Sequence, residues 1–264
     1  MTISGDEIRE AAEKNRLKFG ELFALLEDLS ELTLCYVKSL DQPSSDVRKI
    51  YPTALLLRVW TASQAIRSLL RDGFNDDAFA GVRTMLEIEF QLSAISKEPE
   101  LTEQLVRENE HYRGRRLQNL LKHKIKLPDE FQESEVEVEI QRIEAEQKAL
   151  GAKPLTKREI AKVGECLTDF ETIYSYLSDI VHVSPMGLAE YVSVDSLSKV
   201  ATLRYGTAPL PMQYAFLWNS SILLRCLALV STIIQKDPPG TFGELAGRHD
   251  KLWDKYVVSS NSAS

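Results

Sequence analysis

The sequence predicts an all-α protein, and three observations support that prediction. Apolar residues recur at helical spacing along the chain, capping motifs precede them, and alternating strand patterns are scarce. The chain has 264 residues, of which 44% are hydrophobic and 27% charged, values close to those of soluble globular domains. No Gly/Ser-rich linker interrupts it. We therefore expect one domain over residues 1–258, a bundle of about eight or nine helices, followed by a disordered tail at 259–264.

Caps and apolar spacing indicate the first two helices. Ser4 and Glu7 form a capping box, and the helix that they open continues through an apolar stripe to about Leu40. The second helix ends at Gly73, because glycine readily takes the left-handed conformation that terminates a helix. We expect this helix to start near Pro52, since proline fits a first turn, where its missing N–H is not needed.

A third helix and a charged hairpin follow. Asn75 is the expected N-cap of a helix that runs to about Lys97. Residues 99–150 predict two helices joined at Leu127-Pro128, an excursion from the bundle. The first arm is basic, and the second arm, residues 129–150, contains eight acidic residues. Pairing of the two arms would mask the basic residues that are candidates for a nucleic-acid contact, Arg113, Arg115, Arg116 and Lys122.

The C-terminal part predicts three more helices and an irregular connection. A capping box at Thr156–Glu159 opens a helix that we expect to continue without a break to His182. Residues 184–211 mix Gly, Pro and Ser with short apolar pieces, which is typical of a functional or mobile connection. Two helices, at about 211–235 and 242–256, complete the bundle.

The compartment is expected to be the cytoplasm. Residues 214–235 are apolar enough to suggest a membrane helix, but Arg225 lies within them, and a charge at the bilayer centre costs roughly 2.5–3.5 kcal/mol. We therefore predict a buried core helix and no membrane. The N-terminus has neither a basic start nor an apolar stretch, so we expect no signal peptide. Three widely separated cysteines predict buried thiols in a reducing compartment: Cys35, Cys166 and Cys226.

Five polar residues on two helices are the best candidates for a site. Tyr174, Ser178 and His182 are four residues apart, so they share one face of a helix. Arg83 and Glu87 have the same spacing in an otherwise apolar window. A buried polar group without a partner costs about 1–3 kcal/mol, so we expect the two sets to face each other and to form hydrogen bonds across the helix interface.

This five-residue cluster has two interpretations. His182 could act as an acid or base near neutral pH. The alternative, which we favour, is a polar ladder that holds two helices in register or lines a small polar pocket. Ser-His-Asp hydrolysis is disfavoured, because Asp179 lies about 100° around the helix from Ser178 and no Gly-x-Ser-x-Gly turn occurs. Metal-binding and nucleotide-binding motifs are absent from the sequence, so we expect no cofactor and no metal.

Two short segments resemble a known family. Arg83-Thr-Met-Leu-Glu87, after Gly73-Phe-Asn-Asp-Asp-Ala78, and Tyr174-Ser-Tyr-Leu-Ser178-Asp-Ile-Val-His182 resemble a bacterial all-helical family catalogued as domain of unknown function 5677, over residues 50–185. The resemblance implies an α-helical domain in which an Arg/Glu helix lies near a Tyr/Ser/His helix. The family has no settled reaction.

A more distant likeness is to the HEPN superfamily of helical domains, many of which are metal-independent ribonucleases of toxin–antitoxin and anti-phage systems. Their signature is an arginine, usually followed by a polar residue, with a histidine a few residues later. Here Ser178 and His182 keep the polar residue and the histidine, but Leu177 stands where the arginine is expected. Arg83 could supply the missing cation from the neighbouring helix.

Two functions follow from these observations. The first is a non-enzymatic or regulatory binding module in which the cluster is structural or lines a polar pocket. The second is a HEPN-like ribonuclease that uses His182, so enzymatic activity is left undecided. The net charge of −7 gives no general attraction to nucleic acid. RNA bound locally by the basic arm, and a second copy of the chain in a homodimer, both stay open as partners.

Overall fold

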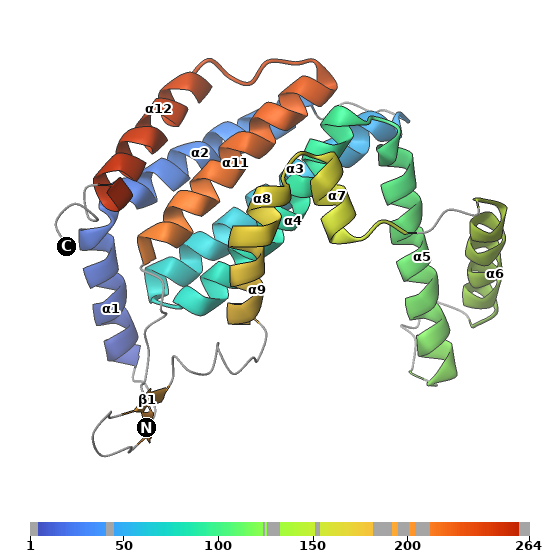
Figure 1. The fold of residues 1–264 in the computed structure, drawn as a ribbon, viewed down its shortest axis with the longest axis horizontal. Coiled ribbons are helices and arrows are strands. Elements are labelled where there is room, and N and C mark those ends of the chain that lie inside the picture. Colours follow the sequence, from blue (N-terminus) through green and yellow to red (C-terminus); the bar gives the residue numbers. More distant parts are fainter. Residues whose placement is uncertain are drawn as a thin grey trace.

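The protein is an all-α bundle, as predicted (Figure 1). The computed structural model describes residues 5–40, 45–123, 125, 133–150, 154–181, 192–194, 201–203 and 212–258. Its helices are α1 (Gly5–Lys18), α2 (Gly20–Leu40), α3 (Val47–Asp72), α4 (Asn75–Lys97), α5 (Leu101–Lys122), α6 (Glu133–Leu150), α7 (Lys157–Val163), α8 (Leu167–Asp169), α9 (Ser175–Val181), α11 (Met212–Ile234) and α12 (Phe242–Trp253). Two π-helical turns, Phe170–Tyr174 and Asp254–Val258, continue α8 and α12.

The core lies between α2, α3, α4 and α11, which pack against one another. By length and composition α11 could cross a membrane. In the fold, however, it lies among the other three helices, with Phe216, Leu223 and Leu227 buried against them. This burial confirms the prediction of a core helix. Each such side chain stabilises the fold by about 1.5–3 kcal/mol when it leaves water.

The first predicted helix is divided into two. The chain bends at Phe19 and Gly20, so that α1 packs on α3 whereas α2 packs on α3 and α11. Phe19 is buried and contacts the rings of Phe216 and Tyr256. A continuous helix cannot bury this ring and also place α1 on α3. Gly20 allows the bend at a low cost in backbone conformational energy.

The second predicted helix starts earlier than expected. α3 begins at Val47, after an N-cap at Asp46 whose side chain accepts a hydrogen bond from the Arg48 N–H. Pro52 is therefore inside the helix and not near its start, and it is buried. The aspartate cap and the packing of the proline ring offset the hydrogen bond that proline cannot make. The predicted stop is confirmed, because Gly73 has a φ of 86°.

The boundaries of α4 and α11 agree with the sequence to within a residue or two, whereas α5 ends at Lys122 and α6 starts at Glu133, each about four residues from the predicted boundary. α4 ends at Lys97 as predicted, but its N-cap is Phe74, and Asn75 is its first helical residue. Within 184–211 the structure adds a short antiparallel pair, β1 (Val192–Val194) and β2 (Ala201–Leu203), with Ser193 opposite Thr202. The Ser4 cap, the Leu127-Pro128 turn, His182 and the 259–264 tail lie outside the described residues.

The charged hairpin forms an arm. Figure 1 shows α6 at the edge of the molecule, beyond α5, and the contacts of α6 are made chiefly with α5. Val136, Ile140 and Ile143 of α6 are buried, and Ile143 packs against Gly114 of α5. The alternating segment at Val136–Ile140 is helical, as predicted, because its apolar residues extend the helical spacing to Ile143.

The helix predicted to run from Thr156 to His182 is interrupted. The capping box at Thr156 and Glu159 is present, but α7 ends at Val163, and Glu165 has a φ of 58°. A Cβ atom on Gly164 would lie 2.8 Å from Ser93 and 3.0 Å from the backbone N of Ala94. The chain can approach α4 this closely only at a glycine, and there it turns from α7 into α8.

Candidate functional site

The predicted contact between the two polar sets is confirmed for four of the five residues. Arg83 donates hydrogen bonds from Nε to Ser178 Oγ at 2.9 Å and from Nη2 to the Tyr174 hydroxyl at 2.9 Å. The Tyr174 hydroxyl donates to Glu87 Oε1 at 2.9 Å, and the Arg83 and Glu87 side chains are themselves 3.3 Å apart. The fifth residue, His182, lies outside the described residues. Its proposed catalytic role stays a prediction.

A fifth described residue, Lys157, completes the cluster and was not predicted. Its Nζ lies 2.6 Å from Glu87 Oε1 and 3.3 Å from the Tyr174 hydroxyl oxygen. We call Arg83, Glu87, Lys157, Tyr174 and Ser178 the Arg83 network. On an unbroken helix Lys157 would lie about 25 Å from Tyr174, at 1.5 Å per residue. The turn at Gly164 folds α7 back and brings the two side chains together, and no local pattern in the sequence reports that turn.

Aromatic packing holds Tyr174 in place. Its ring stacks on Phe170 with centroids 5.0 Å apart and planes at 17°, and it meets Phe90 edge-on at 5.9 Å. Tyr174 is the last residue of a π-helical turn, a local irregularity often found at functional sites. The hydroxyl meets the polar groups directly, and the Arg83 guanidinium also lies over the ring, 4.9 Å from its centroid. Tyr174 thus connects the aromatic core to the other residues of the Arg83 network, and its ring packing fixes the position of its hydroxyl.

The Arg83 network is graded from buried to exposed. Tyr174 is 7% exposed, while the side chains of Arg83, Glu87 and Lys157 are 17%, 24% and 53% exposed. Burial by itself lowers the pKa of Lys157, but the Glu87 carboxylate and the Tyr174 hydroxyl raise it more, so the pKa lies above its ordinary value. Lys157 therefore stays protonated at neutral pH. Its positive charge can attract an anion, and the raised pKa disfavours a role as a base or a nucleophile.

A second ion pair lies on another side of α4. Arg225 of α11 donates to both carboxylate oxygens of Glu89, at 2.5 and 2.9 Å, and the Glu89 side chain is 3% exposed. Burial raises the pKa of Glu89 above its ordinary value, and the Arg225 guanidinium offsets part of that rise. The pair borders a hollow of about 410 Å³ that Cys166 and Asp169 also line. From the sequence, Arg225 is predicted only to disfavour a membrane span, and its partner Glu89 is not predicted.

The prediction of three buried thiols is correct for one cysteine. Cys226 is fully buried, and burial raises the pKa of its thiol well above the ordinary value. Cys166 is half-buried, because it follows the turn at Gly164, and Cys35 is exposed on α2. The apolar sequence around a helical cysteine does not report which face of the helix the cysteine occupies.

The basic arm is only partly masked by its acidic neighbour. Arg113 lies 3.2 Å from Glu139 of α6 and 3.5 Å from Glu110. Arg115, Arg116 and Lys122 are exposed and have no ion pair within the part of the chain that the structure describes. Among the described residues, therefore, three of the four basic residues proposed to contact nucleic acid have no acidic partner.

Known proteins give a family but no function. Within the described ranges, no group of three His, Cys, Asp or Glu residues could hold a metal ion. The chain matches no curated protein and no solved structure. Its Arg/Glu helix and Tyr/Ser helix are in contact, as the family resemblance implies. The model of the Family of unknown function (DUF5677) matches residues 49–199, more than half of the chain, and the protein therefore belongs to that family.

Proposed function

We propose that this protein is a non-enzymatic binding module for RNA. The Arg83 network holds neighbouring helices in a fixed arrangement, and basic residues of α5 contact the phosphates of the RNA. The observation that supports it best is the environment of Glu87. Its Oε1 atom is within hydrogen-bonding distance of the Tyr174 hydroxyl and of Lys157 Nζ, and it forms an ion pair with Arg83. A carboxylate with three donors around one oxygen is suited to fixing α4, α7 and the π-helical turn at Phe170–Tyr174 together, not to exchanging protons.

The charge on the α5 arm indicates the partner. Arg115, Arg116 and Lys122 are exposed, and the exposed ring of Tyr112 lies on the same helix. Proteins often bind single-stranded RNA with cations that contact the phosphates and a neighbouring aromatic ring on which a base stacks. Because the whole chain has a charge of −7, such binding would be local and sensitive to salt.

A labelled single-stranded RNA tests binding and cleavage in one preparation. Fluorescence anisotropy should report binding, and a denaturing gel of the same samples should show intact RNA. Arg115→Gln with Arg116→Gln should weaken binding and reduce its salt dependence, by about 0.7 in the log–log slope for each phosphate that the variant no longer neutralises. The matched control is Arg113→Gln, which should change binding less, because Arg113 is already paired with Glu110 and Glu139. Equal weakening in both variants would reject this use of the arm.

A HEPN-like ribonuclease is the second candidate, and one contact favours it. Arg83 Nε lies 2.9 Å from the oxygen of Ser178, the polar residue that precedes His182 in the motif. A cation from α4 thus reaches the motif, in which Leu177 occupies the position where an arginine is expected. If the gel shows cleavage by the parent, and His182→Ala abolishes cleavage while it preserves binding and the melting temperature, the protein is a nuclease and the non-enzymatic proposal fails.

A cytoplasmic location belongs to the same proposal. Cys35 is a free and exposed thiol, which suits a reducing compartment. Fractionation of cells that produce the full-length protein would test this, and recovery of the protein outside the cytoplasm would refute it.

A further inference from the structure

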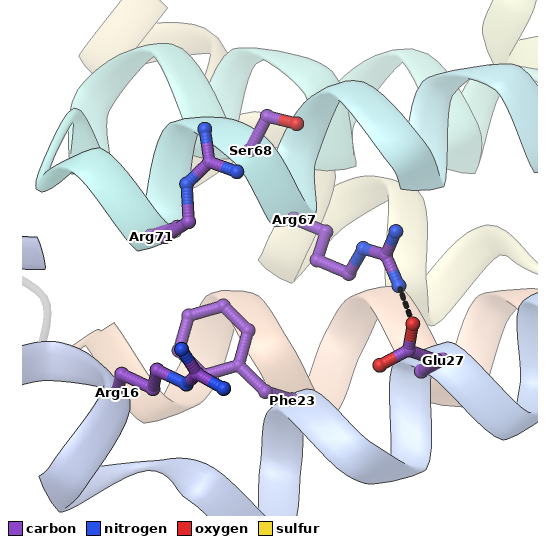
Figure 2. Close-up of a pocket in the computed structure, with 6 residues that line it drawn as sticks. All are labelled: Arg16, Phe23, Glu27, Arg67, Ser68 and Arg71. Atoms are coloured by element: carbon purple, nitrogen blue, oxygen red, sulfur yellow. Dashed lines mark ion pairs between the residues drawn. The ribbon is translucent and has the colours of Figure 1, made fainter.

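A groove at the C-terminal end of α3 is lined by three arginines, although the chain as a whole is acidic. It lies between α1 and α2 on one side and the last turns of α3 on the other (Figure 2). The arm contacts α3 near Arg48, so the groove at Arg67 lies about 30 Å further along the helix. The residues that line it are Arg16, Phe23, Glu27, Arg67, Ser68 and Arg71.

The groove brings together three guanidinium groups and one carboxylate. Figure 2 shows Arg67 and Arg71 coming from α3, and Arg16 coming from the opposite side. Arg67 lies 3.5 Å from Glu27, whose side chain is 65% exposed, so this ion pair is weak. Arg71 donates two hydrogen bonds to its neighbour Asp72, at 2.8 and 3.2 Å, so its Nη1 is the group left for a ligand.

Arg16 has no hydrogen bond or ion pair to any residue that the structure describes. Glu27 and Asp72 compensate part of the charge of Arg67 and Arg71, so the positive charge of Arg16 is the part of the groove that can attract an anion. Guanidinium groups bind phosphate oxygens through paired hydrogen bonds, so a phosphate is the anion that fits them.

One residue of the groove is apolar, and it adds a second requirement. Phe23 is partly buried, and the ring of Phe216 meets it edge-on with centroids 4.6 Å apart, which fixes its orientation. A ring held in this way offers a flat surface beside the cations, on which a second flat ring can stack. Ser68 is exposed and makes no hydrogen bond to a described residue, so its hydroxyl can donate to the same ligand.

The available space is adequate for a small ligand. The groove holds about 220 Å³, and it opens into a hollow of about 810 Å³ that shares Arg16, Phe23, Glu27 and Arg71. A Cβ atom added to Gly20, which lines this hollow, would meet no atom within 4 Å. Pockets for small molecules fall in the range of roughly 300–1,000 Å³.

We propose that this groove binds a nucleoside monophosphate, with the phosphate between Arg16 and Arg71 and the base against Phe23. The site is separate from the Arg83 network and from the RNA contacts proposed for the arm. Phosphate alone would engage the arginines, and a nucleoside alone would engage Phe23. A ligand that carries both a phosphate and a base engages the arginines and Phe23 at the same time.

Calorimetric titration of the full-length protein with AMP, adenosine and inorganic phosphate tests this assignment. AMP should bind most tightly, and inorganic phosphate should compete with it. Arg16→Gln should weaken AMP binding about ten-fold or more, the usual effect of losing a charged hydrogen bond. Arg16 is exposed, so this variant should keep the melting temperature of the parent. Phe23→Leu, which keeps apolar bulk in the core, should reduce the preference for AMP over inorganic phosphate.

The matched control is Arg58→Gln on the exposed side of α3, outside the groove, which should bind AMP like the parent. The Arg115→Gln and Arg116→Gln variant of the arm should do the same, while Arg16→Gln should leave RNA binding unchanged. The assignment is overturned if AMP does not bind to the parent, if adenosine binds as well as AMP, or if Arg58→Gln lowers the affinity as much as Arg16→Gln does.

Discussion

Glu87→Gln is the most informative substitution for the Arg83 network. Glutamine has the shape of glutamate but no charge, and its amide brings extra N–H donors close to Arg83 and Lys157. In the parent, Oε1 of Glu87 lies 2.6 Å from Lys157 Nζ and 2.9 Å from the Tyr174 hydroxyl oxygen. The substitution therefore removes the only carboxylate of the network and leaves two cations beside each other.

The magnitude follows from how deeply these groups are buried. Removing one partner of a fully buried ion pair costs about 3–5 kcal/mol, whereas exposed pairs contribute about 0–1 kcal/mol. Arg83 and Glu87 are 17% and 24% exposed, so they lie closer to the buried limit, while Lys157 at 53% adds little. We expect a decrease in stability of about 2–3 kcal/mol, which lowers the melting temperature of a protein of this size by about 5–10 °C.

Thermal and urea unfolding followed by far-ultraviolet circular dichroism measure the effect. The matched control is Glu10→Gln, which breaks a Glu10–Lys14 ion pair of 2.8 Å in which both side chains are more than 65% exposed, and it should not change the melting temperature. If Glu87→Gln also melts within about 1 °C of the parent, water replaces the hydrogen bonds of the carboxylate and the Arg83 network does not hold the three helices together.

Four further predictions concern other parts of the fold. Arg225→Met should cost about 3 kcal/mol in urea unfolding, because it leaves Glu89 buried without its partner, and adding Glu89→Leu should recover most of the stability; a double variant as unstable as the single one would contradict this. The pKa of Glu89 is raised in the folded state. The contribution of Glu89 to stability therefore falls as the pH rises above the ordinary pKa of a glutamate. The deficit of Arg225→Met relative to the parent should therefore grow from about pH 5 to about pH 8, and a deficit that shrinks would reverse the sign. Gly164→Ala should lower the melting temperature, because its Cβ would lie 2.8 Å from Ser93, whereas Gly243→Ala has open space and should not; similar melting of the two would show that α7 shifts freely. Deleting residues 99–150 and bridging the gap should leave a body that melts cooperatively, since α6 contacts chiefly α5 and it is the first turns of α5, with Leu101 and Leu105, that join the core; the absence of cooperative melting would show that the core depends on those turns.

The sequence by itself determined the features that depend on neighbouring residues. The helical class, the stop at Gly73 and the capping box at Thr156 follow from patterns a few residues long, and the structure confirms each. The contact of the Arg83 helix with the Tyr174 helix was also predictable. Residues four apart share a helix face, and polar groups on two mostly apolar faces must find one another.

Tertiary structure alone decided which other distant groups meet. Lys157 and Glu87 are 70 residues apart in sequence, and Arg225 and Glu89 are 136 apart. Their contacts depend on where the chain turns, and those turns depend on close packing. Gly164 breaks a helix because α4 lies against it, and Phe19 bends another because the core takes its ring. A pattern of helical spacing is the same for a straight helix and a broken one, since the energy that selects between them comes from side chains elsewhere in the chain.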